Sequence, residues 1–383
     1  MIKNVALKLS RYIVNKSDDC KVNRITQIAD FKKINNCKKV FNKKILFVIP
    51  MMISGSGGLT SILRIAYRLE KKGFNITFAS YEGGTIEKMI KASKSNLDGY
   101  NIRFIDYYEA KNLEYEYVIA CNWQAVYYSK DIVGYKIYFT QDFEPYFYSY
   151  SDNYFLAKKA YELGFHIISL GKWNIEQIIK NCDKDIDIKM DFIEFPFESK
   201  EYVYEKKDFN EYEYKKEVKI AIYTKREKKR MPGLILSMVK KAKEILKDDG
   251  IELIPFYFGL NKKEKIDGAV NLGRVSKKEL SNLYHECDFG MVASMTNISL
   301  VPYEMIGSGL PVIEFKDGTY SSFLGTNTAL LIDFDAKELV SIIKKSMKNP
   351  KELKSMTESA YERIKQLSWD NTAEEFYRVL IKE

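Results

Sequence analysis

The residues best suited to chemistry lie between Asp288 and Glu314, in the sequence DFGMVASMTNISLVPYEMIGSGLPVIE. Two apolar runs, 289–293 and 312–315, predict short buried parallel strands, and a helix that contains Glu304 is expected between them. Ligands of open α/β sheets bind at the carboxyl ends of the strands, where helix N-termini hold phosphates. A carboxylate at that edge suits the hydroxyl groups of a ribose. The alternative is that Glu304 only opens the helix, favoured by the helix dipole.

A second candidate group follows another predicted strand, in the sequence TQDFEPYFY. Gln141, Asp142 and Glu144 emerge there at a strand's carboxyl end, and Trp123 follows the strand before it. Two carboxylates among aromatic rings such as Tyr146 suit sugar hydroxyls and stacking on sugar faces. Either carboxylate could serve acid–base chemistry if burial raises its pKa. The alternative is a Pro-terminated loop packed by its aromatic rings.

Two further segments offer groups for an anion. The basic run KREKKR, with Lys225, Lys229 and Arg230, follows the first predicted strand of the second half and could neutralise a diphosphate leaving group. A charge run is also typical of a solvated face. Gly57 and Gly58 precede a predicted helix, where glycine lets backbone approach an anionic ligand or simply makes a tight turn. The segment lacks both GxGxxG and Gly-Lys-Ser/Thr, so it predicts neither a dinucleotide site nor a P-loop.

Alternating strands and helices must position these residues. Such units build parallel sheets, so the sequence predicts an α/β protein with two doubly wound, Rossmann-like domains. The predicted strands are 44–50, 75–79, 102–105, 117–121, 136–140 and 166–170 in the first half, and 219–223, 253–258, 270–272, 289–293, 312–315 and 329–332 in the second.

Composition narrows the class of protein. The 383 residues suffice for two or three domains, and no apolar run reaches the length of about 18 residues that a transmembrane helix needs. The five cysteines are scattered without a CxxC pair, which fits a reducing cytoplasm and argues against a zinc site or a disulfide framework. With only two histidines, catalysis by histidine is also disfavoured.

The net charge of +9 is concentrated at the N-terminus. Residues 1–44 carry 12 Lys/Arg and 3 Asp/Glu, so the remaining residues sum to zero. We interpret residues 1–43 as a basic extension whose first part predicts an amphipathic helix. Such a helix can lie on an anionic membrane or pack its apolar stripe on the body of the chain. A nucleic-acid arm is the weaker alternative, because nothing else in the chain is basic in excess.

Two of the motifs resemble those of a known family. Glu304 followed by MIGSGLPVI resembles the donor-nucleotide segment of the GT-B glycosyltransferases, and QDFEPYFY resembles the QDxEPxFY element of the WsaF-like bacterial rhamnosyltransferases. The resemblance covers residues 44–383. It implies a GT-B fold of two Rossmann-like domains that face a central cleft. The expected parts are an acceptor-side domain, 44–205, a nucleotide-sugar-binding domain, 206–366, and a C-terminal helix, 367–383, that returns toward the first domain.

The resemblance also implies roles for individual residues. Glu304 would bind the ribose, while Lys229 and Arg230 would stabilise the departing diphosphate. Asp142 and Glu144 would orient or deprotonate the acceptor hydroxyl, and Trp123, Gln141 and Tyr146 would bind substrate. The other donor-side residues implied are Gly57, Gly58, Lys225, Gly273, Arg274, Val275, Asn297, Ile298, Ser299 and Leu300. Two of these depart from the family pattern: Lys225 stands where an Arg is usual, and Asn297 stands where a Glu is usual.

The function implied is transfer of a sugar from a nucleotide-sugar donor, with L-rhamnose from dTDP-β-L-rhamnose as the best guess. The acceptor would be a cell-surface glycan or glycoprotein, the anomeric configuration would be retained, and no metal or other cofactor is expected. The protein would be cytoplasmic, with peripheral membrane contact through residues 1–43 and no nucleic-acid partner. The alternatives left open are a nucleotide-sugar epimerase, a non-catalytic partner in a glycan-assembly complex, and a nucleic-acid binder that uses the basic N-terminus.

Overall fold

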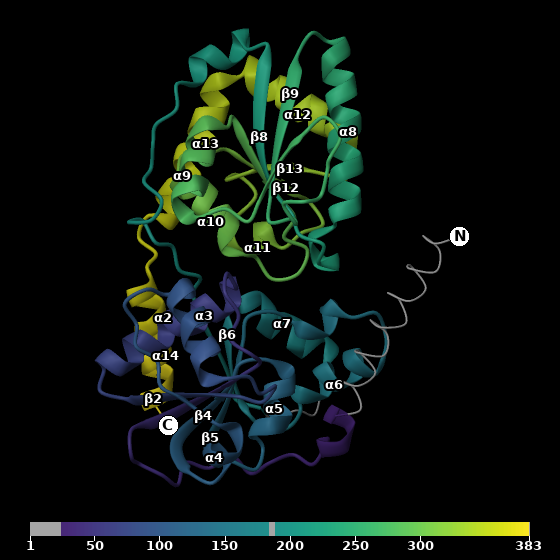
Figure 1. Cartoon of the computed structure of the whole chain (residues 1–383). Helices are drawn as coiled ribbons and strands as arrows, with labels where there is room; N and C mark the ends of the chain where they lie inside the picture. The colour runs from purple at the N-terminus through teal and green to yellow at the C-terminus, as the bar shows by residue number, and fades with distance from the viewer. Residues whose placement is uncertain (1–23, 184–187, 383) are drawn as a thin grey trace. The chain divides into compact units, whose positions relative to one another are not determined.

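The computed structural model describes residues 24–183 and 188–382. The chain divides into two compact units (Figure 1). Unit 1 contains Met1–Ile193 and Ala373–Glu383, and unit 2 contains Glu194–Thr372. None of the helices among the described residues combines the length and apolar content that crossing a bilayer requires.

Unit 1 is built on a seven-stranded parallel sheet with the strand order β3-β2-β1-β4-β5-β6-β7. Right-handed crossovers from β1 to β3 and from β4 to β7 run in opposite directions, which places helices on both faces. The strands are β1 (Lys44–Ile49), β2 (Asn75–Ser80), β3 (Phe104–Ile105), β4 (Glu114–Ala120), β5 (Val133–Thr140), β6 (His166–Leu170) and β7 (Met190–Ile193). The helices are α2 (Gly57–Lys71), α3 (Ile86–Asn96), α4 (Tyr107–Lys111), α5 (Trp123–Ser129), α6 (Asp152–Ala160), α7 (Lys172–Asn181) and the 3-10 helix η1 (Glu144–Phe147).

The pattern of burial explains which strands the sequence revealed. Five of the six residues of β1 are buried, as expected for a central strand of a parallel sheet. The edge strand β7, which the sequence did not predict, buries only Ile193 of its four residues. An edge strand packs on fewer neighbours, so it needs no continuous apolar run, and the sequence pattern does not predict it.

The described part of the N-terminal extension packs on unit 1. The Ile34 amide donates to the Leu163 carbonyl at 2.9 Å, and Asn36 exchanges two hydrogen bonds of 2.8 Å with the backbone of Lys136. Lys38 forms an ion pair of 2.8 Å with Glu116. Residues 24–43 are therefore part of this unit's surface. The amphipathic helix predicted for the start of the chain falls on residues 1–23, outside the described residues, and membrane contact through residues 1–43 stays a prediction.

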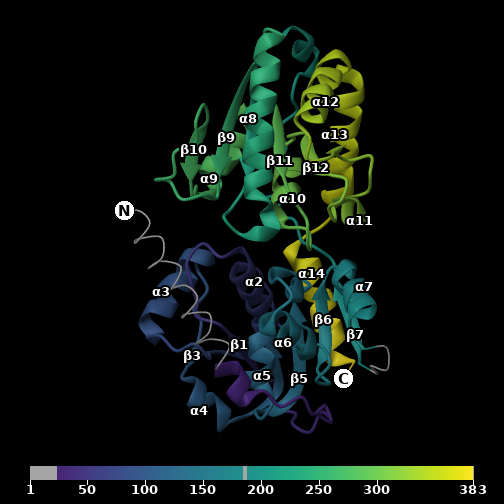
Figure 2. The same ribbon diagram turned by 90° about the vertical axis from the view of Figure 1, so that its right-hand side faces the viewer.

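Unit 2 is built on a six-stranded parallel sheet with the order β10-β9-β8-β11-β12-β13, and Figure 2 shows β10, β9, β11 and β12 in this order across the sheet. The strands are β8 (Glu217–Tyr223), β9 (Glu252–Phe258), β10 (Val270–Gly273), β11 (Phe289–Val292), β12 (Val312–Phe315) and β13 (Leu330–Ile332). The helices are α8 (Pro232–Asp248), α9 (Lys277–Glu286), α10 (Leu300–Gly307), α11 (Tyr320–Leu324), α12 (Ala336–Lys348), α13 (Pro350–Ile364) and the 3-10 helices η2 (Phe209–Tyr214) and η3 (Lys228–Arg230). In Figure 1 α8 lies on one side of this sheet, and α9, α10 and α13 lie on the other.

Aromatic packing sets the start of unit 2. The ring of Phe195 stacks on Tyr303 with 5.7 Å between centroids, and Phe197 lies directly against Gly307. Residues 194–205, which we assigned to the first domain from sequence, therefore belong to unit 2.

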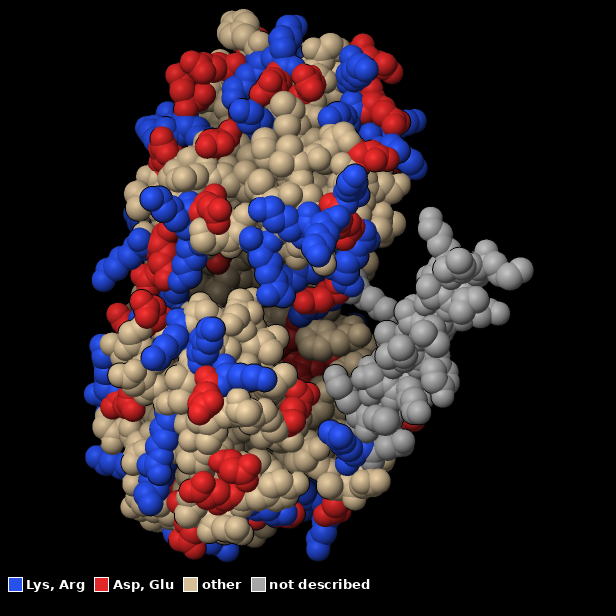
Figure 3. Space-filling model, viewed as in Figure 1, with Lys and Arg blue, Asp and Glu red and all other residues tan. Residues whose placement is uncertain are grey.

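The last helix, α14 (Trp369–Ile381), starts in unit 2 and ends in unit 1. The Tyr117 hydroxyl donates to the Leu380 carbonyl at 2.6 Å, and the ring of Phe376 packs edge-on against Phe139 at 5.4 Å. The predicted α/β fold with two Rossmann-like sheets and a C-terminal helix that returns to the first unit is confirmed. On the face seen in Figure 3, Lys and Arg side chains are interspersed with Asp and Glu, as the balanced charge of residues 45–383 predicts.

Candidate active site

The topology of unit 2 creates a switch point between β8 and β11. These strands pair with Tyr223 opposite Val292, and the chain leaves β8 toward β9 but leaves β11 toward β12. The loops that follow the two strands therefore separate from a common starting point. In doubly wound sheets, this is the place where ligands bind.

Arg230 joins the two loops at this switch point. It ends η3, only 7% of it is exposed, and its Nη1 donates to the Ala293 carbonyl at 3.0 Å. Its guanidinium also lies 5.4 Å from the centre of the Tyr223 ring. The next residue, Met231, has a left-handed backbone with φ of 45°, a conformation that costs a non-glycine residue energy. The strained turn places a buried cation beside the end of β11.

Three buried polar atoms around the switch point have no hydrogen-bond partner among the described residues. They are Nε of Arg230, Oγ1 of Thr224 and Oγ of Ser299. Thr224 follows β8, and Ser299 is the N-cap residue of α10 although its side chain does not cap the helix. Buried polar groups in proteins are nearly always hydrogen-bonded, so the three atoms are available to a ligand. An anion with several oxygen atoms suits a guanidinium, two hydroxyls and a helix N-terminus.

Glu304 lies on α10 and is half-buried. It is the fifth residue of the helix, and the first turn contains no acidic residue. The alternative that Glu304 merely favours the helix start is therefore weaker than the sequence suggested, since the dipole effect is confined to the first turn. Burial, together with the charge of Glu304, raises the pKa of the buried Tyr284 hydroxyl well above its ordinary value.

The other donor-side residues differ in exposure. The Lys225 side chain is one-third exposed and forms a long ion pair of 3.9 Å with Glu227. Gly273 has φ of 71°, and a Cβ there would lie 2.7 Å from Cβ of Lys262, so the turn requires glycine. Gly273, Asn297 and Ile298 are buried, Lys229, Val275 and Leu300 are half-buried, and Arg274 is exposed.

In unit 1, the structure brings Gln141 to the glycine-rich loop. Nε2 of Gln141 donates to the Gly58 carbonyl at 3.1 Å, which joins the end of β5 to the first turn of α2. Gly57 is exposed, and a Cβ added to it would meet nothing within 4 Å. The predicted groups at the ends of β1 and β5 thus share one edge of the sheet.

Glu144 is buried and hydrogen-bonded within the fold. Its Oε2 accepts hydrogen bonds from the Trp123 amide at 2.6 Å and from the Tyr138 hydroxyl at 2.9 Å. These contacts tie the loop after β5 to the start of α5. Asp142 is also buried, and its carbonyl accepts from Oγ1 of Thr140 at 2.6 Å.

Trp123 and Tyr146, both predicted to bind substrate, lie in different environments. Trp123 is 2% exposed, and its Nε1 donates to the Tyr148 hydroxyl at 3.1 Å, so its burial and its contacts are those of a core residue. Tyr146 is 40% exposed, and its hydroxyl donates to Oε1 of Gln177 at 3.2 Å.

Sequence reasoning missed Glu314, a fully buried carboxyl group on β12. Its Oε1 accepts from Oγ of Ser294 at 2.6 Å, directly after β11. Burial raises the pKa of Glu314 to about 7, against the opposing effect of its hydrogen bonds and of Arg230. The signal that could have revealed it is one acidic residue inside the apolar run Val312–Phe315.

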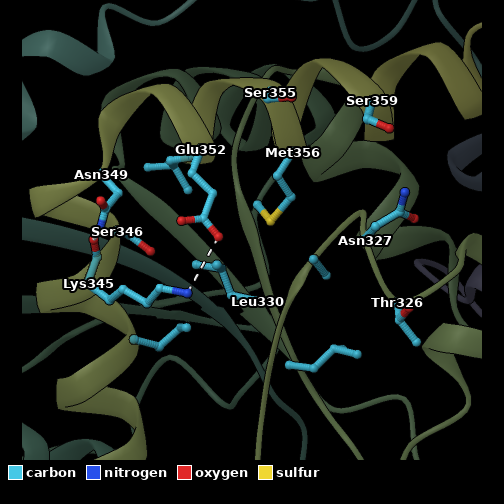
Figure 4. Close-up of a pocket in the computed structure, with 14 residues that line it drawn as sticks. Thr326, Asn327, Leu330, Lys345, Ser346, Asn349, Glu352, Ser355, Met356 and Ser359 are labelled. Atoms are coloured by element: carbon cyan, nitrogen blue, oxygen red, sulfur yellow. Dashed lines mark hydrogen bonds and ion pairs between the residues drawn. The ribbon is translucent and has the colours of Figure 1, made fainter.

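A separate pocket of about 480 Å³ in unit 2 contains none of the predicted residues (Figure 4). It lies between α12, α13 and the residues around the start of β13, and the ion pair of Lys345 with Glu352, 3.4 Å long, crosses it. Its chemistry is mixed and its charge balanced, so it does not compete with the switch point for an anion. No group of three or more His, Cys, Asp or Glu side chains that could hold a metal ion occurs within the described ranges.

No protein-family model and no curated protein sequence matches this chain. Several solved structures are similar to it in fold. Anabaena HepE in complex with UDP-glucose has a TM-score of 0.67 and 12% identity, and the match covers 89% of this chain and 100% of HepE. Sucrose-phosphate synthase from Thermosynechococcus elongatus has a TM-score of 0.66 and 12% identity, with coverage of 89% and 99%.

A third similar structure is a mutant of S. aureus TarM in complex with fondaparinux, alpha-GlcNAc-glycerol and UDP. It has a TM-score of 0.66 and 10% identity, and the match covers 88% of this chain and 100% of TarM. At this level of identity, the likeness is one of fold. Together with the two Rossmann-like sheets and the returning helix α14, it establishes that the chain has the GT-B fold.

Proposed function

We propose that this protein is a glycosyltransferase that transfers a sugar from a nucleoside diphosphate sugar bound by unit 2. The observation that carries the proposal is the set of buried polar atoms of Arg230, Thr224 and Ser299 at the switch point of unit 2, which have no hydrogen-bond partner within residues 24–183 and 188–382. A diphosphate would fill the hydrogen-bonding capacity of all three. The structures of HepE with UDP-glucose and of TarM with UDP support a ligand of this class.

The charge that develops on a leaving diphosphate sets the roles of the donor-side residues. Arg230, with Lys225 and Lys229 from the same loop, would stabilise that charge, as would the N-terminus of α10. Glu304, farther along α10, would bind the ribose hydroxyls. With cations and a helix dipole in these roles, transfer would require no bound metal ion, and chelation with EDTA would leave the activity unchanged.

The acceptor side of the reaction is assigned to unit 1. Asp142 and Glu144 would orient or deprotonate the acceptor hydroxyl, and the two hydrogen bonds that Glu144 accepts would fix the position of its carboxylate. Gln141 and the exposed Tyr146 lie near the same end of β5 and would contact the acceptor. The motif QDFEPYFY favours dTDP-β-L-rhamnose as donor and a cell-surface glycan or glycoprotein as acceptor, with retention at the anomeric carbon.

A thermal-shift panel with UDP, dTDP, GDP and CMP and their available sugar conjugates tests the proposal. A ligand at 100 times its Kd adds about 2.7 kcal/mol to the free energy of unfolding. We expect one nucleoside diphosphate to raise the melting temperature of the wild type. The rise should be much smaller in Arg230→Lys, because lysine keeps the positive charge but lacks the planar guanidinium that binds two oxygen atoms at once. A shift selective for dTDP and dTDP-rhamnose supports the rhamnosyl assignment, and a shift selective for UDP overturns it.

Three results would contradict the transferase assignment. The absence of any nucleotide shift would argue against a donor site at the switch point. Binding without turnover, in the presence of candidate acceptors, would instead favour a non-catalytic nucleotide-binding protein. Conversion of the free sugar nucleotide without an acceptor would identify an epimerase.

A further inference from the structure

Glu314 is an acidic residue at a place where the fold favours an apolar one. β12 lies between β11 and β13, and all four of its residues, Val312–Phe315, are buried. Glu314 itself has no exposed surface. Taking a carboxyl group out of water is costly even when it is hydrogen-bonded, and an apolar residue of similar size is often as stable or more stable there.

The carboxyl group holds one residue, Ser294, by two atoms. Oγ of Ser294 donates to Oε1 at 2.6 Å, and the Ser294 amide donates to Oε2 at 3.2 Å. The Phe315 amide adds a longer contact of 3.4 Å to Oε2. All three groups are donors that point at the carboxyl oxygens, an arrangement that suits a carboxylate.

Ser294 is held from a second side as well. Its carbonyl accepts from the Thr319 amide at 2.7 Å and from Oγ1 of Thr319 at 3.0 Å. The carbonyl of its neighbour Ala293 is the acceptor for Arg230. Three segments of the fold, from η3, from β12 and from the loop before α11, thus converge on residues 293 and 294.

This convergence lies at the start of the loop that forms the candidate anion site. The chain runs from Ser294 to Ser299 and then enters α10, so the position of Ser294 determines where that loop begins. The ionisable groups that interact electrostatically with Glu314 are Arg230 from η3 and Tyr320 from α11. Glu314 is therefore coupled both to the loop and to its buried cation.

We propose that Glu314 is a positioning residue that holds Ser294, and through it residues 294–299 and Arg230, in the shape that binds a nucleoside diphosphate. The proposal rests on the donor site proposed above. It assigns Glu314 a function that stability does not explain, because the carboxyl group costs the fold energy at a place where an apolar side chain would fit.

The test compares stability with nucleotide affinity in the same variants. Glu314→Leu removes the carboxyl group, Glu314→Gln keeps its size and one acceptor oxygen, and Glu252→Gln is a matched control at the exposed start of β9. The melting temperature is measured at pH 8 without ligand, and the Kd for UDP, dTDP and GDP by calorimetry. We expect Glu314→Leu to melt at or above the wild-type temperature and to bind the preferred nucleotide about tenfold more weakly. Glu314→Gln should fall between, and Glu252→Gln should match the wild type.

A double-mutant cycle separates positioning from a general effect. If Glu314 acts through Ser294, Ser294→Ala should weaken binding in the same way, and the double variant with Glu314→Gln should be no weaker than the worse single variant. Independent, additive losses would overturn the route through Ser294.

The remaining outcomes are distinguishable. If the wild type binds and Glu314→Leu binds equally well, the positioning role is wrong while the donor site stands. If stability and affinity fall together in both Glu314 variants, Glu314 is a structural residue only. If the wild type binds none of the three nucleotides, the donor site is wrong and the positioning role falls with it.

Discussion

At the residue scale, the acidic and basic side chains around the switch point of unit 2 differ mainly in burial. Arg230 is buried and bonded to the backbone, Glu314 is buried and bonded to Ser294, and Glu304 is half-buried. Lys225 is one-third exposed, and its ion pair with Glu227 is long. Buried charges respond strongly to substitution and exposed ones weakly, so the buried residues carry the sharper predictions.

Glu304→Ala should lower nucleotide affinity without unfolding the protein. A hydrogen bond between a carboxylate and a ribose hydroxyl is worth about 1.5–3 kcal/mol, which corresponds to a loss in affinity of roughly ten- to a hundredfold. This loss is measured by calorimetry with the nucleotide that raises the melting temperature of the wild type. Glu286→Ala, an exposed acidic residue at the end of α9, is the control. Unchanged binding in Glu304→Ala would remove the ribose role.

The stability of Glu314→Gln relative to the wild type should depend on pH. The folded state raises the pKa of Glu314 to about 7 from an ordinary value of 4.5, so folding takes up a proton between these values. This contribution to stability is present below about pH 4.5 and is lost as the pH rises toward 7. Glutamine does not titrate. The free energy of unfolding of the variant, relative to that of the wild type, should therefore rise by up to about 3 kcal/mol between pH 5 and pH 8.

Thermal unfolding of both proteins at pH 5, 6, 7 and 8 measures the difference. Parallel curves would mean that the Glu314 carboxyl group keeps its ordinary pKa in the folded state. This measurement needs no ligand, so it is independent of the proposed donor site.

At the element scale, the glycines of the GSGLP segment after Glu304 serve packing. A Cβ at Gly307 would lie 2.1 Å from the ring of Phe197, and a Cβ at Gly309 would lie 2.2 Å from the Glu205 carbonyl. Gly309 also has φ of 78°. The motif thus allows the end of α10 and the turn into β12 to pack in close contact with residues 197–205. These contacts fix the position of α10, the helix that carries Glu304.

Gly309→Ala should therefore destabilise the protein strongly. The left-handed backbone costs an alanine about 1–2 kcal/mol, and the clash with a backbone carbonyl adds to it, so we expect a loss of at least about 2 kcal/mol. Gly233→Ala is the matched control, because Gly233 lies in α8 with φ in the ordinary range and open space around its Cβ position. The control should keep or slightly raise the wild-type stability. Equal free energies of unfolding for Gly309→Ala and the wild type in a denaturant titration would show that the backbone near residues 205 and 309 can adjust without cost.

At the scale of the whole molecule, charge is divided between an N-terminal segment and a balanced body. Residues 1–23 contain five Lys/Arg and two Asp/Glu. Residues 24–43 pack on unit 1 through Ile34, Asn36 and Lys38. Several cations of this segment, including Lys32 and Lys39, are exposed, so a membrane contact through residues 1–43 stays a prediction for the whole extension.

Deletion of residues 1–23 should reduce binding to anionic vesicles and leave the nucleotide shift unchanged. Each cation near an anionic surface contributes about 1 kcal/mol, so the loss should be large at low salt and smaller at high salt. Co-sedimentation with phosphatidylserine-containing vesicles measures it, with phosphatidylcholine vesicles as the control. Equal sedimentation of the full chain with both vesicle types would reject an electrostatic membrane contact.

Much of the fold could be predicted from sequence. The central strands are continuous apolar runs because a parallel sheet is covered on both faces, and that pattern is visible in β1, β8 and β11 without any tertiary information. The edge strand β7 escaped because it buries a single residue. The start of unit 2 was placed too late because the stacking of Phe195 on Tyr303 joins residues far apart in the chain.

For the candidate site, the sequence by itself determined which residues reach the carboxyl edges of the sheets. Residues that follow a buried parallel strand must emerge there, and this holds for Gln141 and Asp142 as it does for Lys225. Only the tertiary structure decided which polar groups form hydrogen bonds within the fold and which can bind a ligand. Glu144 binds the Trp123 amide, and Glu314 holds Ser294. Nε of Arg230 finds no hydrogen-bond partner in the part of the chain that the structure describes. The physical reason is that a hydrogen bond of a buried side chain depends on groups brought close by folding, and their spacing along the chain contains no record of that proximity.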